Sequence, residues 1–389
     1  MSANLSSTIA DMEPSPTLKV KEQAAALEEQ GRSVLDLSVG DPDFDTPAHV
    51  KEAAREALEN GFTHYTSASG ISELKRAISD RYYREYGVRY DLDQIIVSVG
   101  AKQSLYNLMV VLLNPGDRVL VPVPYWVSYP PQIQMAGGEM RTVETKIGDH
   151  LVPQMDHLQK KTGERSKAII LNTPNNPTSL TIGASDLERV YSFALEHDMV
   201  LISDECYDKL VYGQDYTSAA SLPMENKVII NSLSKTFAMT GWRIGYALGP
   251  TKIIQAMGRL QSHSTSNPCS IAQKAAVSAL NGPSETTEEM VSKFEKRKDY
   301  LLSTLESVPG FDPVPPSAAF YLWINVSQHL RGSNSNSTAF CADLLQNTGV
   351  ALVPGAAFGQ ESYLRLAYCA SRDKLGEAVE RITEYCNNL

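Results

Sequence analysis

Between residues 94 and 263 the chain alternates short apolar runs with amphipathic stretches of helical periodicity, and this alternation restricts the fold more than any other feature. Strands and helices that follow each other in this way favour a largely parallel sheet, because each helix returns the chain to the start of the next strand. The predicted strands are Gln94–Val99, Arg118–Val123, Glu139–Glu144, Lys167–Asn172, Met199–Asp204, Lys227–Asn231 and Ile244–Leu248. The predicted helices are Lys102–Leu113, Ala184–His197 and Thr251–His263.

Polar groups that are unusual in a sheet interior follow several of these predicted strands. Parallel strands present their carboxyl ends at one edge of a sheet, and α/β proteins bind their ligands there. Residues that are distant in the sequence are therefore expected to meet in one site. The polar groups at these strand ends are Gly100–Lys102, Asn175–Asn176, Asp204–Glu205 and Ser232–Lys235.

The segment Asn231–Tyr246 carries the most specific signal in the chain. Lys235 is preceded by Ser232 and Ser234, and Arg243 lies eight residues further on. Small hydroxyls and a guanidinium suit a phosphate group, because an arginine fork matches phosphate oxygens in two-point geometry. A lysine beside such a site suits a Schiff base with an aldehyde cofactor that carries a phosphate, and pyridoxal phosphate is that cofactor.

After residue 285 the pattern changes to shorter elements. A long charged helix is predicted around Glu285–Ser307, and a Ser/Asn-rich segment, Arg331–Ser337, is predicted to be a solvated loop. Short strands and a closing helix indicate a smaller α+β domain. These elements are predicted at Ala319–Asn325, Val350–Val353, Leu364–Ala367 and Asp373–Cys386.

Composition excludes several classes of protein. The formal net charge of −10 disfavours a nucleic-acid partner, which needs a concentrated cationic surface. No run reaches the roughly 18 apolar residues that a membrane span requires, and Met1–Ser7 lacks the basic and apolar regions of a secretion signal. The five scattered cysteines contain no C-x-x-C pair and predict reduced thiols in the cytoplasm. The dispersed histidines indicate no metal site.

The lysine segment resembles that of fold type I pyridoxal-phosphate aminotransferases, specifically the aspartate aminotransferase family. Matching segments extend from residue 14 to residue 370, which is nearly the whole chain. The resemblance implies a large α/β domain around a mixed seven-stranded sheet and a small α+β domain built from both ends of the chain. The implied division is an N-terminal segment 1–45 that packs with the small domain, a large cofactor-binding domain 46–285 and a small domain 286–389.

The resemblance also assigns a cofactor site. Lys235 would hold the cofactor covalently and then move the α-proton of the substrate, while Asp204 would pair with the pyridinium nitrogen and Tyr207 with the phenolic oxygen. Tyr65 would reach the cofactor phosphate of a neighbouring subunit, which implies a homodimer with shared active sites. The remaining implied contacts are Asn176 at the phenolic oxygen, Trp126 stacked on the ring, and Ser232, Ser234, Arg243 and the amides of Ala101 and Lys102 at the phosphate.

Substrate contacts follow from the same resemblance. Arg365 would bind the α-carboxylate of the substrate through two parallel hydrogen bonds, and the Gly40 backbone would lie beside that carboxylate. Trp126 and Asn176 would also contact the substrate. A dicarboxylic substrate needs a second cation, and Lys102 matches a lysine that aspartate aminotransferases place at a helix start. The expected reaction is transamination of aspartate or glutamate with 2-oxoglutarate or oxaloacetate. In the alternative interpretation, the Lys102 side chain points to solvent, and only the Lys102 backbone amide contributes to the site, by binding the cofactor phosphate.

A further likeness concerns prephenate. The segment Pro14–Thr17 resembles the N-terminal segment of relatives that act on prephenate. Those relatives often carry an arginine a few residues earlier, where this chain has Asp11 and Met12. Prephenate is therefore disfavoured.

Four positions depart from the family pattern. Ser179 and Ala318 stand where glycine is usual, Ala367 replaces a common serine, and Cys269 replaces a threonine. Ser179 directly follows the turn Asn172–Thr178, so this departure bears on the backbone geometry there.

Three other functions remain open at this level. An eliminating, cyclising or decarboxylating enzyme would use the same cofactor motifs, so these motifs do not separate it from a transaminase. Aminotransferase-like domains also serve as effector-binding parts of transcription factors, although the chain shows no DNA-binding extension. A catalytically inactive interaction protein is the third alternative, and the presence of Lys235, Asp204 and Arg365 together disfavours it.

Overall fold

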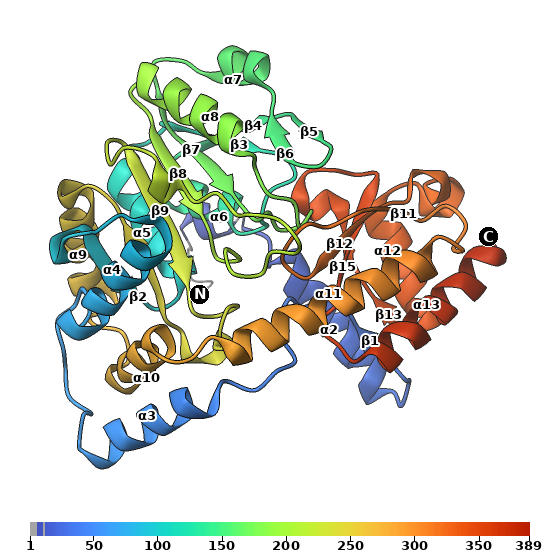
Figure 1. Cartoon of the computed structure of the whole chain (residues 1–389). Coiled ribbons are helices and arrows are strands. Elements are labelled where there is room, and N and C mark those ends of the chain that lie inside the picture. The colour runs from blue at the N-terminus through green and yellow to red at the C-terminus, as the bar shows by residue number, and fades with distance from the viewer. Residues whose placement is uncertain (1–5, 11) are drawn as a thin grey trace, which may run out of the picture.

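A computed structural model of the chain describes residues 6–10 and 12–389 (Figure 1). Two predictions involve residues outside this description. Residues 1–5 belong to the segment that lacks a secretion signal, and Asp11 stands where relatives that act on prephenate often carry an arginine. Among the helices of the described part, none combines the length and the apolar character needed to cross a membrane.

A seven-stranded sheet forms the centre of the larger part of the molecule, in the order β2-β10-β9-β8-β7-β3-β4. All seven predicted strands lie in this sheet, each with ends within one residue of the prediction. β10 runs antiparallel to both of its neighbours and the other pairs are parallel, so the predicted mixed sheet is confirmed. The strands are β2 (Ile95–Ser98), β3 (Arg118–Pro122), β4 (Glu139–Val143), β7 (Ser166–Asn172), β8 (Val200–Asp204), β9 (Lys227–Ser232) and β10 (Gly245–Leu248).

Helices cover both faces of this sheet because successive side chains of a buried strand point to opposite sides. In β7, Ile169 packs with the helices of one face and Ile170 with those of the other. The first face is covered by α4 (Ser72–Tyr86), α8 (Ala184–Glu196) and α10 (Ser270–Asn281), and the second by α5 (Ala101–Leu112), α6 (Tyr129–Met135) and α9 (Thr251–Ser264). The three predicted helices correspond to α5, α8 and α9.

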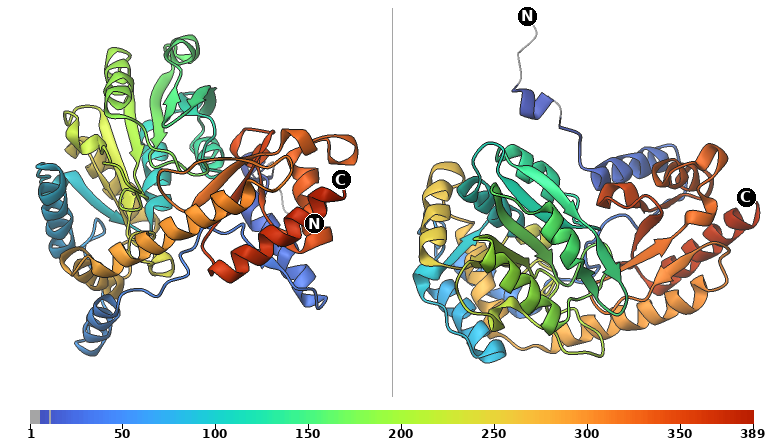
Figure 2. Two further views of the ribbon diagram at one scale, coloured as in Figure 1. Left: turned by 45° about the vertical axis from the view of Figure 1, so that its right-hand side comes forward. Right: turned by 90° about the horizontal axis from the view of Figure 1, so that it is seen from above.

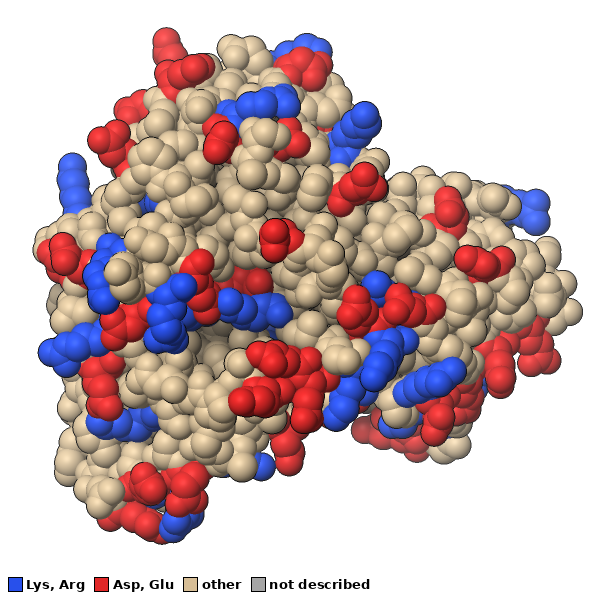
Figure 3. Space-filling model, in the orientation of Figure 1, with Lys and Arg blue, Asp and Glu red and all other residues tan. Residues whose placement is uncertain are grey.

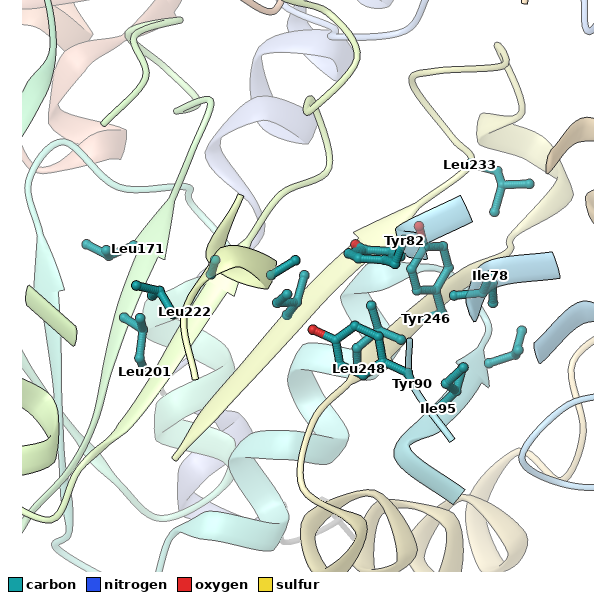
Figure 4. Packing of buried hydrophobic residues seen from close by; sticks show 14 of the residues in the cluster. Ile78, Tyr82, Tyr90, Ile95, Leu171, Leu201, Leu222, Leu233, Tyr246 and Leu248 are labelled. Atoms are coloured by element: carbon teal, nitrogen blue, oxygen red, sulfur yellow. The ribbon is translucent and has the colours of Figure 1, made fainter. Parts of the chain in front are cut away.

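Figure 4 shows the packing on the first face close to the edge strand β2. Tyr82 of α4 lies edge-on to Tyr246 of β10, with ring centroids 6.4 Å apart, and Ile78 of α4 and Ile95 of β2 pack beside them. Each fully buried side chain of this size contributes about 1.5–3 kcal/mol to the free energy of unfolding. This packing fixes α4 against β2 and β10.

A second, four-stranded sheet has the order β11-β12-β15-β14. The chain reaches it through the long helix α11 (Glu285–Leu305), which runs from the larger part of the molecule to the smaller one (orange in Figure 1). The other elements of the smaller part are β11 (Asp312–Val314), β12 (Tyr321–Asn325), α12 (Ser337–Thr348), β13 (Val350–Ala351), β14 (Val353–Pro354), β15 (Tyr363–Ala367) and α13 (Arg372–Asn387).

The N-terminal segment packs with this smaller part. β1 (Leu35–Asp36) pairs in parallel with β13, and α2 (Pro16–Glu29) contacts both β13 and β14. Figure 2 shows the blue N-terminal segment against the red C-terminal elements from two directions. The elements not yet named are α1 (Ser7–Ala10), α3 (Ala48–Glu59), the hairpin β5 (Thr145–Ile147) and β6 (Leu151–Pro153), and α7 (Met155–Lys161).

Three details of the smaller part differ from the prediction. The strand predicted at Val350–Val353 is two strands in different sheets, because β13 pairs with β1 and β14 with β15. β12 begins at Tyr321 rather than Ala319, since Ala319 has a left-handed backbone with a φ of 51°. Arg331–Ser337 is not solvated throughout, because Asn334 and Ser337 are buried.

Buried polar contacts account for the last difference. The Asn334 side chain donates to Asp343 and Tyr385, and the Ser337 hydroxyl donates to Glu361 at 2.8 Å. Two of these partners, Tyr385 and Glu361, lie 51 and 24 residues away, so the local Ser/Asn composition gave no sign of them.

Candidate active site

A pocket of about 350 Å³ opens at the carboxyl ends of the central strands, between the two sheets. Of the described residues that the family resemblance assigned to the cofactor or substrate, Tyr65 alone lies outside its lining. The pocket gathers the twelve others, which are Gly40, Ala101, Lys102, Trp126, Asn176, Asp204, Tyr207, Ser232, Ser234, Lys235, Arg243 and Arg365. Asn175 and Glu205, which the strand-end pattern also grouped with the site, lie outside the lining, and the Glu205 carboxylate accepts hydrogen bonds from Ser218 and Ala219 instead.

Lys235 lies in the loop that follows β9, and its Nζ donates to the carbonyl oxygen of Gly40 at 2.7 Å. Burial lowers the pKa of the Lys235 ammonium from its ordinary value. A lowered pKa increases the share of neutral amine, which is the form that attacks an aldehyde. Gly40 is required here, because a Cβ atom would lie 1.9 Å from the hydroxyl oxygen of Tyr321.

Asp204 ends β8 and is 4% exposed. Its Oδ2 accepts a hydrogen bond of 2.7 Å from the Tyr129 hydroxyl, and the Cys206 amide donates to Oδ1 at 3.4 Å. Burial raises the pKa of the Asp204 carboxyl, and these hydrogen bonds oppose that shift. Three residues beyond Asp204, the Tyr207 hydroxyl lies 2.9 Å from the Tyr321 hydroxyl.

Arg365 of β15 is buried under two aromatic rings, with its guanidinium 4.5 Å from the Tyr321 centroid and 5.0 Å from that of Phe358. It donates to Asn176 Oδ1 at 2.9 Å and to the Ser38 carbonyl. Its Nε has no partner within the described residues. A buried guanidinium held by neutral acceptors keeps its charge available for an anion, and its fork matches a carboxylate.

Anion-binding groups meet at the other end of the pocket. Ser232, Ser234 and Arg243 lie there with Ala101, the first residue of α5. The amides of a helix's first turn have no partner within the helix, so they bind anions. A Cβ on Gly245 would lie 2.1 Å from the Ala101 amide nitrogen, so this close approach requires glycine. Gly100 has a left-handed backbone with a φ of 80°, which favours glycine there. This donor set fits a phosphate.

A family model described as aminotransferase class I and II matches residues 32–382. The chain belongs to this family. The aminotransferase moves an amino group between an amino acid and a 2-oxo acid, and its family depends on pyridoxal phosphate. The likeness read from the sequence is thereby confirmed.

Known proteins match this aminotransferase over nearly its whole length. It is 44% identical to an aspartate aminotransferase of Geobacillus stearothermophilus, with 98% of each chain covered. An aspartate/prephenate aminotransferase of Cereibacter sphaeroides is 41% identical, with 100% of each chain covered. The aspartate aminotransferase from Thermus thermophilus with maleate shares the fold with a TM-score of 0.93 and 39% identity, covering 98% of this chain and 100% of that one.

The aminotransferase pocket also contains residues that the sequence analysis did not assign to the site. Tyr321, Cys206, Ser15, Thr17 and Leu18 line it. Ser15 precedes α2 and Thr17 lies in its first turn, so the N-terminal segment closes one side of the site. The likeness at Pro14–Thr17 was the one signal that pointed to this segment.

Ser179 shows how this aminotransferase accommodates a departure from the family pattern. It has a left-handed backbone with a φ of 58°, which costs a non-glycine residue about 1–2 kcal/mol. Its hydroxyl accepts the Tyr321 amide at 3.0 Å, and its carbonyl accepts the amides of Ser317 and Ala318. The serine therefore anchors the start of β12, which carries Tyr321 into the pocket. Nothing in the structure explains the changes at Ala318, Ala367 and Cys269.

Lys102 and Trp126 form the outer wall of the pocket. The Lys102 ammonium lies 5.0 Å from the Trp126 ring centroid, a cation–π distance. The side chain is exposed but lies along the pocket rather than away from it. Tyr65, in contrast, is 89% exposed on the loop between α3 and α4.

Charged side chains of both signs are interspersed over the face shown in Figure 3. The described residues contain no group of three or more His, Cys, Asp or Glu side chains that could hold a metal ion.

Proposed function

We propose that this aminotransferase binds pyridoxal phosphate in the pocket and attaches it to Lys235. The donor set at the phosphate end, the carboxylate of Asp204 and the lowered pKa of Lys235 support this. When bound, the cofactor supplies an electron sink for the α-carbon of the amino acid. Asp204 would hold the positive charge of the ring nitrogen, and Tyr207 and Asn176 would donate to the phenolic oxygen. Trp126 packs on the ring.

Lys235 serves as the base that moves the substrate proton. Its amine lies in a buried part of the pocket, and burial lowers the pKa of its ammonium, which increases the share of neutral amine that could accept a proton. Arg365 orients the amino acid by its α-carboxylate, so the proton to be moved faces Lys235. The same groups accept a 2-oxo acid, which carries the same carboxylate.

We further propose that the physiological substrates are dicarboxylic, namely aspartate or glutamate with 2-oxoglutarate or oxaloacetate. One observation carries this: Lys102 places a fourth cation in the pocket, beside Lys235, Arg243 and Arg365, which have other roles. A second carboxylate on the substrate pairs with this ammonium. The solved relative from Thermus thermophilus is described with maleate, which is a dicarboxylate.

A screen of amino donors against 2-oxo acceptors, with products identified by mass spectrometry, tests the proposed reaction. We expect aspartate and 2-oxoglutarate to give oxaloacetate and glutamate. Product formation that does not need a 2-oxo acid would instead favour an eliminating, cyclising or decarboxylating enzyme on the same scaffold.

Replacing Lys102 with methionine should lower kcat/KM for aspartate by about tenfold to a hundredfold, the loss expected for one hydrogen bond to a charged group. Methionine keeps the length and packing of the side chain but removes its charge. An aromatic or aliphatic donor should lose much less. Steady-state kinetics with both donors give the comparison.

Lys252→Met is the matched control, since Lys252 lies exposed on α9 outside the pocket lining. Equal losses for all donors in Lys102→Met would contradict the proposed role and would assign Lys102 to the cofactor through its backbone.

We also propose a homodimer with shared active sites. A cleft of about 720 Å³ lies beside the phosphate end, and Thr240 and Arg243 line both the cleft and the active-site pocket. A tyrosine entering from outside could therefore reach the phosphate. Tyr65, with 89% of its surface exposed in one chain, is suited to enter the cleft of a second chain.

Replacing Tyr65 with phenylalanine should weaken cofactor binding by about tenfold, the cost of losing one hydrogen bond to a charged group. Equilibrium dialysis of the cofactor against the protein measures this, and light scattering gives the oligomeric state. Tyr83→Phe, at another exposed tyrosine, serves as the control. A stable monomer with full activity would refute the shared site.

Finally, we propose a division of the chain by its cores. The core on the first face of the large sheet contains residues from Val50 to Leu280, whereas the core of the small sheet contains Leu35, Leu37 and residues from Met290 onward. The core of the small sheet also takes in Tyr207, Leu210 and Tyr212, which lie in the segment that contacts it from the larger part. Apart from these contact residues, the cores support an N-terminal segment 1–45, a large domain 46–285 and a small domain 286–389.

A further inference from the structure

Tyr129, the first residue of α6, contacts an active-site residue without lining the pocket itself. Its hydroxyl donates to Oδ2 of Asp204 at 2.7 Å, and the two residues are 2% and 4% exposed. Asp204 lines the active-site pocket, whereas Tyr129 lies outside the pocket lining found among the described residues. The Tyr129 hydroxyl therefore bonds to the Asp204 carboxylate but would not contact a ligand bound in the pocket.

The two carboxylate oxygens of Asp204 have different surroundings. Oδ2 is occupied by the short hydrogen bond from Tyr129. Oδ1 receives a long bond of 3.4 Å from the Cys206 amide, so it keeps capacity to accept a further hydrogen bond. The Cys206 thiol also stabilises the ionised carboxylate, but less than the Tyr129 hydroxyl does. A donor that enters the pocket will meet Oδ1, and Tyr129 fixes the rotation of the carboxylate that presents it.

The backbone around Tyr129 is well suited to hold this position. Pro130 and Pro131 follow directly and fix the backbone of the first helical turn. The Tyr129 ring lies edge-on to Trp126, with centroids 5.5 Å apart and an interplanar angle of 83°. One short segment therefore supplies a pocket-lining ring and the hydroxyl that supports Asp204.

Burial alone would make Asp204 a poor counter-ion. It raises the pKa of the carboxyl, and a more basic carboxylate draws the shared proton from a pyridine nitrogen to itself. A hydrogen bond donated to the carboxylate opposes this by stabilising its ionised form. Of the effects that lower the Asp204 pKa, the Tyr129 hydrogen bond is the largest.

We propose that Tyr129 is a positioning residue, which by donating to Oδ2 of Asp204 keeps this carboxylate ionised and oriented so that the proton stays on the pyridine nitrogen of the cofactor. The inference rests on the proposed function, since it requires that the cofactor binds with its ring nitrogen at Asp204. If Tyr129 only packed in the hydrophobic core, its hydroxyl would have no effect on the protonation of the pyridine nitrogen.

Tyr129→Phe removes the hydroxyl and keeps the ring. With cofactor labelled at the pyridine nitrogen, nuclear magnetic resonance of the holoenzyme should show the nitrogen signal moved toward that of neutral pyridine. Cofactor affinity and kcat should each fall about tenfold, as expected for a lost hydrogen bond to a charged group. The affinity is measured on the apoenzyme, so it does not depend on activity.

Tyr191→Phe is the matched control. Tyr191 is buried on α8 and its hydroxyl bonds to the carbonyls of Pro223 and Glu225, remote from the pocket. This variant should lower the melting temperature without moving the nitrogen signal. In an Asp204→Asn background, Tyr129→Phe should have no further effect on the signal, since both changes act through one carboxylate.

A ring-fluorinated tyrosine at position 129 gives a test of opposite sign. It keeps the hydroxyl and makes it a stronger donor, so the nitrogen signal should move toward that of protonated pyridine. This protein also serves if Tyr129→Phe does not fold. An unchanged nitrogen signal in both proteins, with a lower melting temperature alone, would overturn the inference. Failure of the unaltered protein to bind the cofactor would overturn the proposed function instead.

Discussion

Replacing Lys235 with alanine should lower kcat by about 10⁴-fold, at the upper end of what a positioned proton-transfer group contributes. The amine is the one lysine nitrogen that faces both the Gly40 carbonyl and the interior of the pocket among the described residues. Alanine leaves no group there to carry the proton. The loss should appear in kcat rather than in KM, because Arg365 still binds the substrate carboxylate.

A second measurement on the unaltered protein locates the attachment. Borohydride reduction after addition of the cofactor should fix it to the peptide that contains Lys235, and mass spectrometry should find no such adduct in Lys235→Ala. Lys293→Ala, outside the pocket lining, should retain activity and the adduct. Recovery of an unmodified Lys235 peptide from reduced holoenzyme would contradict the proposed attachment.

The inner strands of the central sheet could be predicted from the sequence because they are mostly continuous apolar runs that end at turn residues, whereas the edge strand β4 is largely polar and exposed. β7, β8 and β9 are buried on both faces, and such strands leave a local signal. The short strands of the smaller part could not be separated in this way. β13 and β14 differ in their partners, and β1, the partner of β13, lies more than 300 residues away.

The residues of the site were predicted for a related reason. Ser232, Asp204 and Asn176 follow strands, and parallel strands bring their carboxyl ends together whatever their order in the sequence. The groups that support them were missed. The Tyr129 hydroxyl meets Asp204 across 75 residues and the Tyr321 hydroxyl meets Tyr207 across 114, so neither contact has a local pattern.

Tyr65 illustrates a different limit. Its family likeness implies a contact across a dimer interface, and one chain places it in solvent. The surface that would receive it includes Arg243, which the sequence assigned to the phosphate. A site that is shared between chains can thus be inferred from one chain by an exposed aromatic residue and a cleft that reaches the pocket.

Replacing Arg365 with lysine should lower kcat/KM about 10²–10⁴-fold for every amino acid and every 2-oxo acid, which corresponds to two lost hydrogen bonds to a charged group. The charge remains, but an ammonium cannot form the two parallel bonds of a guanidinium with a carboxylate. Its shorter reach also breaks the bonds to Asn176 and Ser38 that now fix the side chain.

The range of substrates affected distinguishes the role of Arg365 from that of Lys102. All substrates share the α-carboxylate, whereas only dicarboxylic ones have a second carboxylate for Lys102. Arg372→Lys is the matched control, since Arg372 also lies over a tyrosine ring, 4.5 Å from the Tyr300 centroid, but outside the pocket lining. Cofactor affinity and melting temperature, measured on both variants, show whether the pocket is intact. If Arg365→Lys affected dicarboxylic substrates alone, the α-carboxylate would have to bind elsewhere, and the buried guanidinium would instead serve to hold Asn176 and the N-terminal segment in place.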